Sequence, residues 1–323
     1  MTASDSLTSS AEAAVPFRCS EAAREREDPL FASAPPARHW LLVEHPGPWG
    51  AQALTGGGFP DDVVRAIDAF CRAHHARFQL IRRTALRGAP AEAGGRFAVV
   101  DCRPGHESVR WGRVDAPEAL PNALADLDAS TELSDEPVYL VCAHGRHDAC
   151  CAMRGRPVAA VLAATHPDRT WETTHTGGDR FAANLVLLPH GLVLGRVPAT
   201  EAAAITERYA AGEVDPHLVR GRAGLAPPVQ GAQHHARLAL GEHRVAALAP
   251  VDVRQDAEES ARWTVRLRAP DGVGELEVVV RERWIPSPTP LTCGAGRAAS
   301  MRTYDLVALD GPGIGTDDRS TRP

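Results

Sequence analysis

The sequence predicts an α/β fold, α+β overall, in which one β-α-β-β-β-α pattern occurs twice and a small antiparallel β-hairpin region follows. Strand-like and helix-like segments alternate in the same order in both halves. One landmark also recurs: Arg96-Phe97-Ala98 leads to Gly112-Arg113-Val114, and Arg180-Phe181-Ala182 leads to Gly195-Arg196-Val197 at nearly the same distance. We infer two copies of one fold. Chance similarity between two common α/β patterns is the alternative.

The first copy is expected over residues 37–130. Trp40–Glu44 is rich in apolar residues and ends at a turn rich in Pro and Gly, as a strand does. Over Asp61–His74 the apolar residues recur at helical spacing, after the start signal Pro60-Asp61-Asp62. The other predicted elements are strands at Arg77–Arg82, Arg96–Asp101 and Val109–Val114 and a helix at Ala116–Leu127.

The second copy is expected over residues 136–222 and repeats this order. Its predicted strands are Val138–Val141, Trp171–Thr174, Ala183–Leu188 and Leu192–Val197, and its predicted helices are Arg156–Ala164 and Thr200–Ala211.

A linker around Gly221–Pro228 leads to a C-terminal helix and antiparallel hairpin over residues 229–300. The hairpin strands are Arg262–Arg268 and Glu275–Trp284, which alternate around Pro270-Asp271-Gly272, a strong turn signal. Prolines at positions 286, 288 and 290 are expected to end the regular structure, so residues 301–323 are predicted to be a tail.

Composition and the N-terminal residues argue against secreted, membrane-spanning and nucleic-acid-binding proteins. Residues 1–36 are rich in Ala, Ser and Pro and are expected to be a flexible leader without the features of a secretory signal. No apolar run is long enough to cross a bilayer, which predicts no membrane segment. A net charge of −6 over 323 residues argues against a nucleic-acid binder. The seven cysteines are scattered and odd in number, which favours a reducing cytoplasm over a secreted disulfide scaffold.

Chemistry-bearing residues gather where the loops of the second copy are expected to meet. Cys142 follows its first strand, at the edge where ligands collect in open α/β sheets. Cys151 lies just before a helix, where the peptide dipoles lower the pKa of a thiol and favour the thiolate. His175 ends the next strand, and Thr176-Gly177-Gly178 turns the chain so that Asp179 faces the same side.

Four ligands from two loops are what a [2Fe–2S] cluster requires, and they would equally close a tetrahedral zinc site. Cys150 is an alternative to Asp179 as the fourth ligand. Cys150-Cys151 is not a Cys-x-x-Cys pair, so a thioredoxin-type dithiol exchange site is absent. The first copy has Glu44-His45 at the position of Cys142 and carries no such set.

Three segments of the second copy form one long, ordered motif. They are Cys142-Ala-His-Gly-Arg-His-Asp-Ala-Cys-Cys151, His175-Thr-Gly-Gly-Asp-Arg-Phe-Ala-Ala-Asn184 and Leu185–Val197, the last with two strands joined by Pro-x-Gly. With this motif, residues from about 138 to 212 resemble the thioredoxin-like [2Fe–2S] ferredoxins, and the chain from Arg18 onward resembles the sucrase/ferredoxin-like family. The resemblance implies two tandem thioredoxin-like domains, the second of them the ferredoxin domain. The word "sucrase" implies no glycosidase, since no persuasive pair of carboxylates is present.

By position, the resemblance implies that Cys142 and Cys151 hold one iron and that His175 and Asp179 hold the other. The second pair is Cys-x-x-x-Cys in simple ferredoxins and His-x-x-x-His in some eukaryotic relatives, so Asp179 departs from both patterns. Histidine in place of thiolate raises the potential of such a cluster, and a neighbouring aspartate should partly offset that rise. The choice between Asp179 and Cys150 stays open.

The remaining cysteines and the loop histidines have ordinary interpretations. Cys71 and Cys102 are expected to be small buried side chains. Cys19 and Cys293 lie in irregular segments and receive no role. The histidines at 144 and 147 are expected to be ordinary polar residues of an exposed loop.

The sequence therefore predicts a cytoplasmic iron–sulfur electron-transfer protein with an unidentified redox partner protein, and a non-enzymatic carrier rather than an enzyme. The alternative is a zinc- or thiol-based sensor or binding module on a thioredoxin-like scaffold. A third possibility is a plain interaction protein whose metal site has been lost. The oligomeric state is left open.

Overall fold

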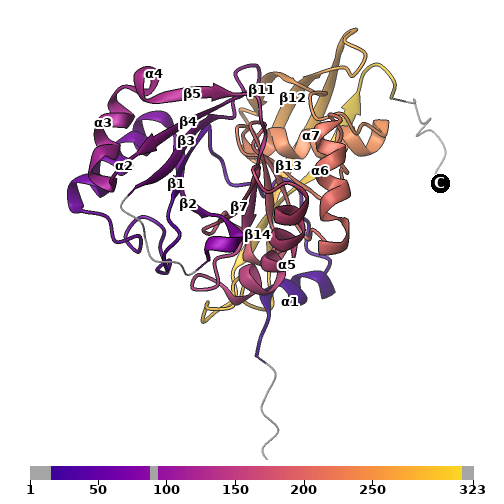
Figure 1. The fold of residues 1–323 in the computed structure, drawn as a ribbon. Coiled ribbons are helices and arrows are strands. Elements are labelled where there is room, and N and C mark those ends of the chain that lie inside the picture. Colours follow the sequence, from indigo (N-terminus) through magenta and orange to yellow (C-terminus); the bar gives the residue numbers. More distant parts are fainter. Residues whose placement is uncertain (1–15, 88–93, 315–323) are drawn as a thin grey trace, which may run out of the picture.

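A ten-stranded mixed sheet runs through both halves of the repeat, and a separate four-stranded antiparallel sheet follows (Figure 1). The computed structural model describes residues 16–87 and 94–314. Helices and strands alternate through both halves, which confirms the predicted α/β class. The strand order of the large sheet is β10-β9-β8-β6-β7-β2-β1-β3-β4-β5.

The first half has the predicted order of elements as far as its last helix, which is divided into η2, α3 and α4 and is followed by a strand, β5, that was not predicted. Its long helix begins after Pro60 and ends where His75 adopts a left-handed conformation, with the bounds that the apolar spacing predicts. Val63, Ile67 and Phe70 are the buried residues of that helix, one face packed on the sheet. The elements are β1 (His39–Glu44), α2 (Asp61–His74), β2 (Ala76–Arg82), η1 (Thr84–Leu86), β3 (Gly95–Asp101), β4 (Ser108–Val114), η2 (Pro117–Ala119), α3 (Leu120–Ala125), α4 (Leu127–Ser130) and β5 (Thr131–Ser134).

The second half begins with β6 (Val138–Cys142), which is buried along its whole length. Helix α5 (Ala149–Thr165) starts seven residues earlier than Arg156, the predicted start, because the carboxylate of Asp148 caps it by accepting the Cys150 backbone N–H at 2.8 Å. The elements that follow are β7 (Thr170–Thr173), η3 (Asp179–Phe181), β8 (Leu185–Leu188), β9 (Leu192–Leu194), η4 (Ala199–Glu201), α6 (Ala202–Ala210) and β10 (Val219–Arg222).

Both halves pair their strands in the same way. The first strand of each half is parallel to the second and antiparallel to the third, which pairs with the fourth: β2-β1-β3-β4 matches β7-β6-β8-β9. The recurring landmark has a structural counterpart, since Phe97 is the Cα partner of Gly112 and Phe181 lies against Gly195. The halves meet where β2 pairs with β7, through Ile81 with Thr173 and Arg82 with Glu172.

The C-terminal unit is larger than the predicted hairpin. The predicted tail is wrong for β14 (Ser300–Asp310), which pairs with the whole of β13 (Glu275–Pro286), so the prolines end one strand rather than the regular structure. The predicted linker is also partly wrong, because β10 occupies Val219–Arg222. The predicted hairpin is confirmed as β12 and β13. Helix α7 (Pro227–Leu240) packs on this sheet, whose other strands are β11 (Pro250–Gln255) and β12 (Arg262–Arg268).

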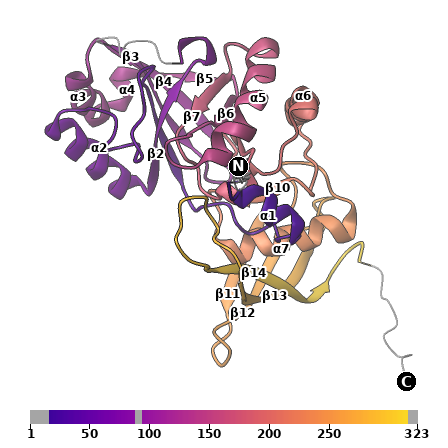
Figure 2. The same ribbon diagram turned by 90° about the horizontal axis from the view of Figure 1, so that it is seen from below.

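The N-terminal segment is packed rather than flexible where the structure describes it. Helix α1 (Cys19–Glu25) buries Cys19 and Ala23, and residues 30–37 place further apolar side chains in the core. The leader expected over residues 1–36 is therefore wrong from Cys19 onward, and residues 1–15 lie outside the described part. Figure 2 shows α1 between the second half and the C-terminal unit.

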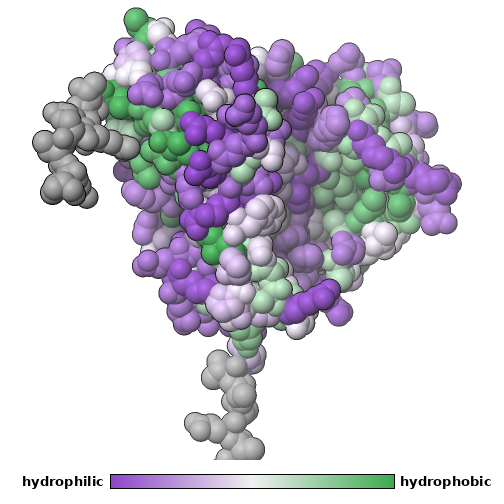
Figure 3. All heavy atoms as spheres, turned by 180° about the vertical axis from the view of Figure 1, so that it is seen from behind, coloured by the Kyte–Doolittle hydropathy of each residue, from purple (hydrophilic) through white to green (hydrophobic). Residues whose placement is uncertain are grey.

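The surface carries both hydrophilic and apolar side chains. Figure 3 shows apolar patches among hydrophilic residues on the face behind that of Figure 1. Exposed apolar residues of the C-terminal unit include Val251, Val253, Trp284 and Leu306. Within residues 16–87 and 94–314, no helix has the length and apolar character needed to cross a membrane.

His234 on α7 gives the fold a predictable sensitivity to acid. Its ring stacks on Phe31 at 4.0 Å, and burial, aided by the nearby His235 and His217, lowers its pKa to about 4. In the unfolded chain a histidine takes up its proton near pH 6.5. Between pH 6.5 and 4 the unfolded state therefore binds more protons, so the free energy of unfolding falls by up to about 3 kcal/mol as the pH decreases across this window.

The measurement is the free energy of unfolding between pH 7 and 4 for the native protein and for His234→Phe, which keeps a ring against Phe31 but cannot titrate. When the pH is lowered from 7 to 4, the free energy of unfolding of the variant is expected to fall by about 3 kcal/mol less than that of the native protein. Equal acid sensitivity of the two proteins would refute the role of His234.

Candidate metal centre

The two predicted thiols lie together at the start of α5. Cys142 is the last residue of β6 and Cys151 is in the first turn of the helix, each with 1% of its surface exposed. Gly155 permits the close approach of helix and strand, since a Cβ on it would come within 2.0 Å of the Cys142 carbonyl oxygen.

The two thiols share one proton. The hydrogen bond from Cys151 holds the pKa of the Cys142 thiol well below its ordinary value, with help from His175. The same bond, together with burial, raises the pKa of Cys151. The pair therefore consists of a thiolate at Cys142 and a thiol at Cys151. Cys151 Sγ also lies 3.1 Å from Asp179 Oδ1, which is a second acceptor for its single proton.

His175 and Asp179 are brought together by the predicted glycine turn. Gly177 and Gly178 have φ angles of 93° and 78°, a left-handed conformation that suits glycine, and they return the chain toward the thiols. His175 Nδ1 lies 2.7 Å from Asp179 Oδ1. Burial disfavours the charged form of both groups, but their charged neighbours have the larger combined effect. Asp179 and Cys142 raise the pKa of His175 to about 9. His175 lowers the pKa of Asp179 below its ordinary value.

The structure thus gathers all four predicted side chains. The donor atoms of Cys142, Cys151 and His175 lie within 4.8 Å of one another, and Asp179 contacts both Cys151 and His175.

The donor set fits a metal on one further observation. His175 Nδ1 is buried, and no residue of the described chain makes a hydrogen bond to it, since its close contact with Asp179 lacks the geometry of one. A buried ring nitrogen without a hydrogen bond is rare in folded proteins. Here it faces thiol and carboxylate donors, and sulfur, imidazole and carboxylate together are ligands for iron or zinc.

His144 is a buried positioning residue, so the prediction of exposed loop polarity is wrong for it. Only 2% of its surface is exposed. Its Nε2 lies 2.6 Å from the Gly50 carbonyl oxygen, and its Nδ1 accepts the His175 backbone N–H at 3.2 Å. These partners require a neutral ring protonated at Nε2, and burial, which lowers the pKa of His144, favours that form.

His147 is likewise part of the site rather than free loop polarity. Its ring stacks on that of His175 at 3.8 Å, and its Nε2 lies 3.8 Å from Asp179 Oδ2. The three histidines at 144, 147 and 175 line a pocket of about 290 Å³, whose other walls are residues 51–54 and 77–79. The histidine side of the site therefore faces this pocket, while the two thiols are buried behind it.

Arg220 on β10 clamps the turn that carries His175 and Asp179. Its guanidinium is fully buried and donates to the Gly177 carbonyl oxygen at 2.7 Å and to Asn184 Oδ1 at 2.8 Å. It also donates to the Ser33 carbonyl oxygen at 2.6 Å. Asn184 in turn donates to the Gly178 carbonyl oxygen at 3.0 Å, so both glycine carbonyls of the turn are held by side chains.

Comparison with known protein families shows to which family this chain belongs. A family model described as sucrase/ferredoxin-like matches residues 30–221, more than half of the sequence. The chain belongs to the sucrase/ferredoxin-like family. The matched region contains both halves of the repeat and the four predicted ligands. No match was found among curated proteins or among solved structures.

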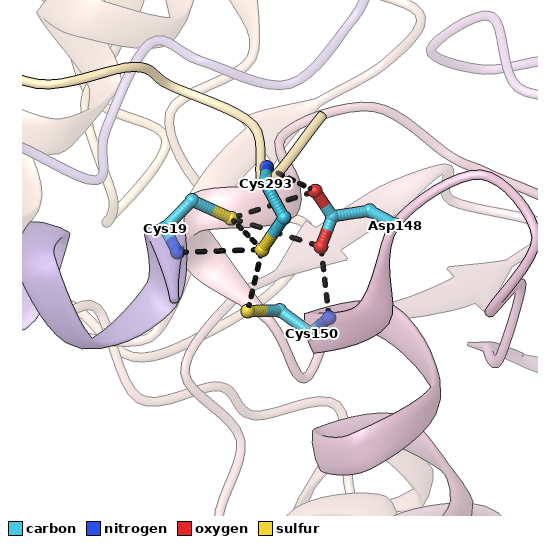
Figure 4. A group of neighbouring side chains, drawn as sticks. All are labelled: Cys19, Asp148, Cys150 and Cys293. Carbon is cyan, nitrogen blue, oxygen red and sulfur yellow. Dashed lines mark hydrogen bonds between the residues drawn. The ribbon is translucent and has the colours of Figure 1, made fainter. Parts of the chain in front are cut away.

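A second group of side chains extends beyond the region shared with the sucrase/ferredoxin-like family. Cys150, the alternative fourth ligand, has its Sγ 3.4 Å from that of Cys293 and belongs with Cys19 and Asp148 rather than with Cys142 and Cys151 (Figure 4). Cys19 and Cys293 were assigned no role from their sequence context. They are 274 residues apart and share no motif, so no local signal connects them.

Proposed function

We propose that this member of the sucrase/ferredoxin-like family carries a [2Fe–2S] cluster on Cys142, Cys151, His175 and Asp179 and transfers electrons. The single observation that carries the proposal is the buried meeting of two thiols with a histidine–aspartate pair whose ring nitrogen has no hydrogen bond. The family and the predicted ligand positions point the same way.

The donors fall into two pairs, and a [2Fe–2S] cluster needs two ligands on each iron. Cys142 and Cys151 share a hydrogen bond and would hold one iron. His175 and Asp179, 2.7 Å apart, would hold the other. A thiolate is already favoured at Cys142 and a carboxylate at Asp179, so these two ligands are present in the form that binds metal.

The cluster supplies the one-electron chemistry, and the chain positions it. His144 orients the backbone of His175, and Arg220 fixes the turn before Asp179. Burial of the thiols keeps water away from the sulfur ligands. The pocket beside the histidines is lined by His175 itself, and we expect a redox partner protein to dock over it.

We place the protein in the cytoplasm, where thiols are kept reduced. All seven cysteines are free of disulfide bonds, which agrees with that location.

A zinc-based sensor or binding module is the second candidate. It is favoured by the close spacing of the donor atoms of Cys142, Cys151 and His175, which lie within 4.8 Å of one another, as the ligands of a single ion do.

The test is the content of iron and acid-labile sulfide in protein purified without oxygen, together with its visible spectrum. About two irons and two sulfides per chain are expected, the content of a [2Fe–2S] cluster. Cys142→Ser is expected to lose the iron and the visible absorption, and Asp179→Ala to lower the iron content or alter the spectrum. Cys71→Ser, which changes a half-buried cysteine on α2 outside the site, is the matched control and should keep both.

Zinc in place of iron, lost in Cys142→Ser, would replace the electron-transfer proposal with the second candidate. A chain without metal in any preparation would overturn both.

A further inference from the structure

We propose that Cys19, Asp148, Cys150 and Cys293 form a second metal site that binds one zinc ion and joins three distant segments of the chain. Figure 4 shows the four side chains pointing toward one another from α1, from the start of α5 and from the loop between β13 and β14. The inference is independent of the iron–sulfur proposal, because no residue is shared between the two sites.

The spacing of the donor atoms is that of a tetrahedral zinc site. Cys293 Sγ lies 3.4 Å from Cys150 Sγ and 3.6 Å from Cys19 Sγ. Two sulfurs on one tetrahedral zinc are about 3.8 Å apart, since each Zn–S bond is about 2.3 Å. All four donor atoms lie within 4.8 Å of one another. A single ion therefore reaches all of them with small movements.

The chemistry of the donors selects zinc. Three thiolates exclude calcium and magnesium, which require oxygen ligands. A [2Fe–2S] cluster would need its ligands divided between two irons, whereas here Cys293 is close to both other cysteines. Zinc accepts thiolates and a carboxylate in one closed set of four.

Asp148 is held in place as a ligand would be. Its Oδ1 accepts the Cys150 backbone N–H at 2.8 Å, and its Oδ2 accepts the Cys293 backbone N–H at 2.6 Å. Cys19 Sγ lies 3.7 Å from each of these oxygens. A carboxylate has further lone pairs beyond these two bonds, so one oxygen is free to bind metal while the backbone fixes the orientation of the group.

The buried carboxylate of Asp148 has no ion-pair partner among the described residues. Its side chain is 2% exposed, and within the described chain no arginine or histidine forms an ion pair with it. Arg180, the cation near Cys19, pairs with Asp28 instead, at 3.5 Å. Buried charges are normally paired or bound to metal, and a zinc ion would supply the missing positive charge. Cys293 is half-buried, which leaves an entry path for the ion.

Zinc here would fasten the C-terminal unit and α1 to the second half. The segment before β14 contacts the second half through Cys293, and α1 does so through Cys19. Because a metal site that is absent from the unfolded chain adds its binding free energy to folding, the loaded protein should be more stable than the zinc-free one.

The experiment measures zinc and iron in the full-length protein from cells grown with both metals. The native protein is expected to hold about one zinc per chain. Cys293→Ser should hold close to none while its iron content stays unchanged. Cys142→Ser should do the reverse, losing iron and keeping zinc, so failure of the iron–sulfur proposal and failure of this one are distinguishable. Cys71→Ser is the control for both metals.

A second measurement adds zinc chloride to chelator-treated protein and follows the melting temperature. We expect an increase for the native protein and none for Cys293→Ser. Cys293→His, which offers zinc another accepted ligand, should recover part of the increase. The proposal is overturned if native protein and Cys293→Ser contain equal zinc, if iron is lost in Cys293→Ser, or if a disulfide among the three cysteines is found in the freshly purified protein.

Discussion

Replacing Arg220 with methionine is expected to lower the free energy of unfolding by about 3 kcal/mol or more and to release the turn that carries His175 and Asp179. Methionine fills much of the same space but donates nothing. The carbonyl oxygens of Gly177 and Ser33 would lose buried hydrogen bonds, as would Asn184 Oδ1. Each acceptor left unsatisfied in the interior costs about 1 to 3 kcal/mol.

Denaturant unfolding of Arg220→Met, with Arg208→Met as the control at an exposed arginine, measures the first effect. The second effect is read as metal content after gel filtration, where the variant is expected to retain less than half of the native amount at the candidate centre. A stability loss below about 1 kcal/mol with full metal retention would contradict the role given to Arg220.

Replacing Glu172 with leucine is expected to cost about 3 to 5 kcal/mol, because it breaks a buried charge network where the two halves of the large sheet meet. Glu172 on β7 is fully buried and accepts hydrogen bonds from Arg82 Nε at 3.1 Å and from Arg87 Nε at 3.0 Å. Arg87 is partly exposed and can turn to water, but Arg82 is buried over the ring of Trp49 at 3.8 Å. Removing one partner of a buried ion pair leaves the other charge uncompensated.

The double variant Arg82→Met/Glu172→Leu separates this penalty from simple loss of packing. Replacing both members of a buried pair by apolar residues is often close to neutral, so the double variant should recover most of the stability that Glu172→Leu loses. The coupling free energy from the four proteins is the quantity to report. A double variant as unstable as the sum of the single ones would show that charge is not the cause.

Local patterns predicted much of the fold. The apolar spacing of Val63, Ile67 and Phe70 gave the bounds of α2, because a helix buries one face every three or four residues. The strand β14 was missed, since its place beside β13 depends on pairing across a thirteen-residue gap, residues 287–299, that no turn signal marks. Helix α1 was missed because it has seven residues and no side-chain cap at Arg18.

The candidate centre followed from sequence because each of its residues lies at a strand end, a helix start or a glycine turn, and such positions meet at one edge of a sheet. His144 was predicted to be exposed because the Gly50 carbonyl, which contacts its buried ring, is 94 residues away in the sequence. The group around Asp148 was also missed because its members are far apart in the sequence. Its cysteines at 19 and 293 are brought together only by the finished fold.

The separation of Cys19 and Cys293 has a consequence for the newly made chain. Cys293 is synthesised 274 residues after Cys19, which takes roughly 14 to 55 s at the usual speed of translation. During that time α1 and the start of α5 can meet, but their thiols have no third cysteine to face. Chains that stop early never acquire it. The group of four can therefore close only after Cys293 has been made, and a chain that stops before that residue lacks one of the four side chains.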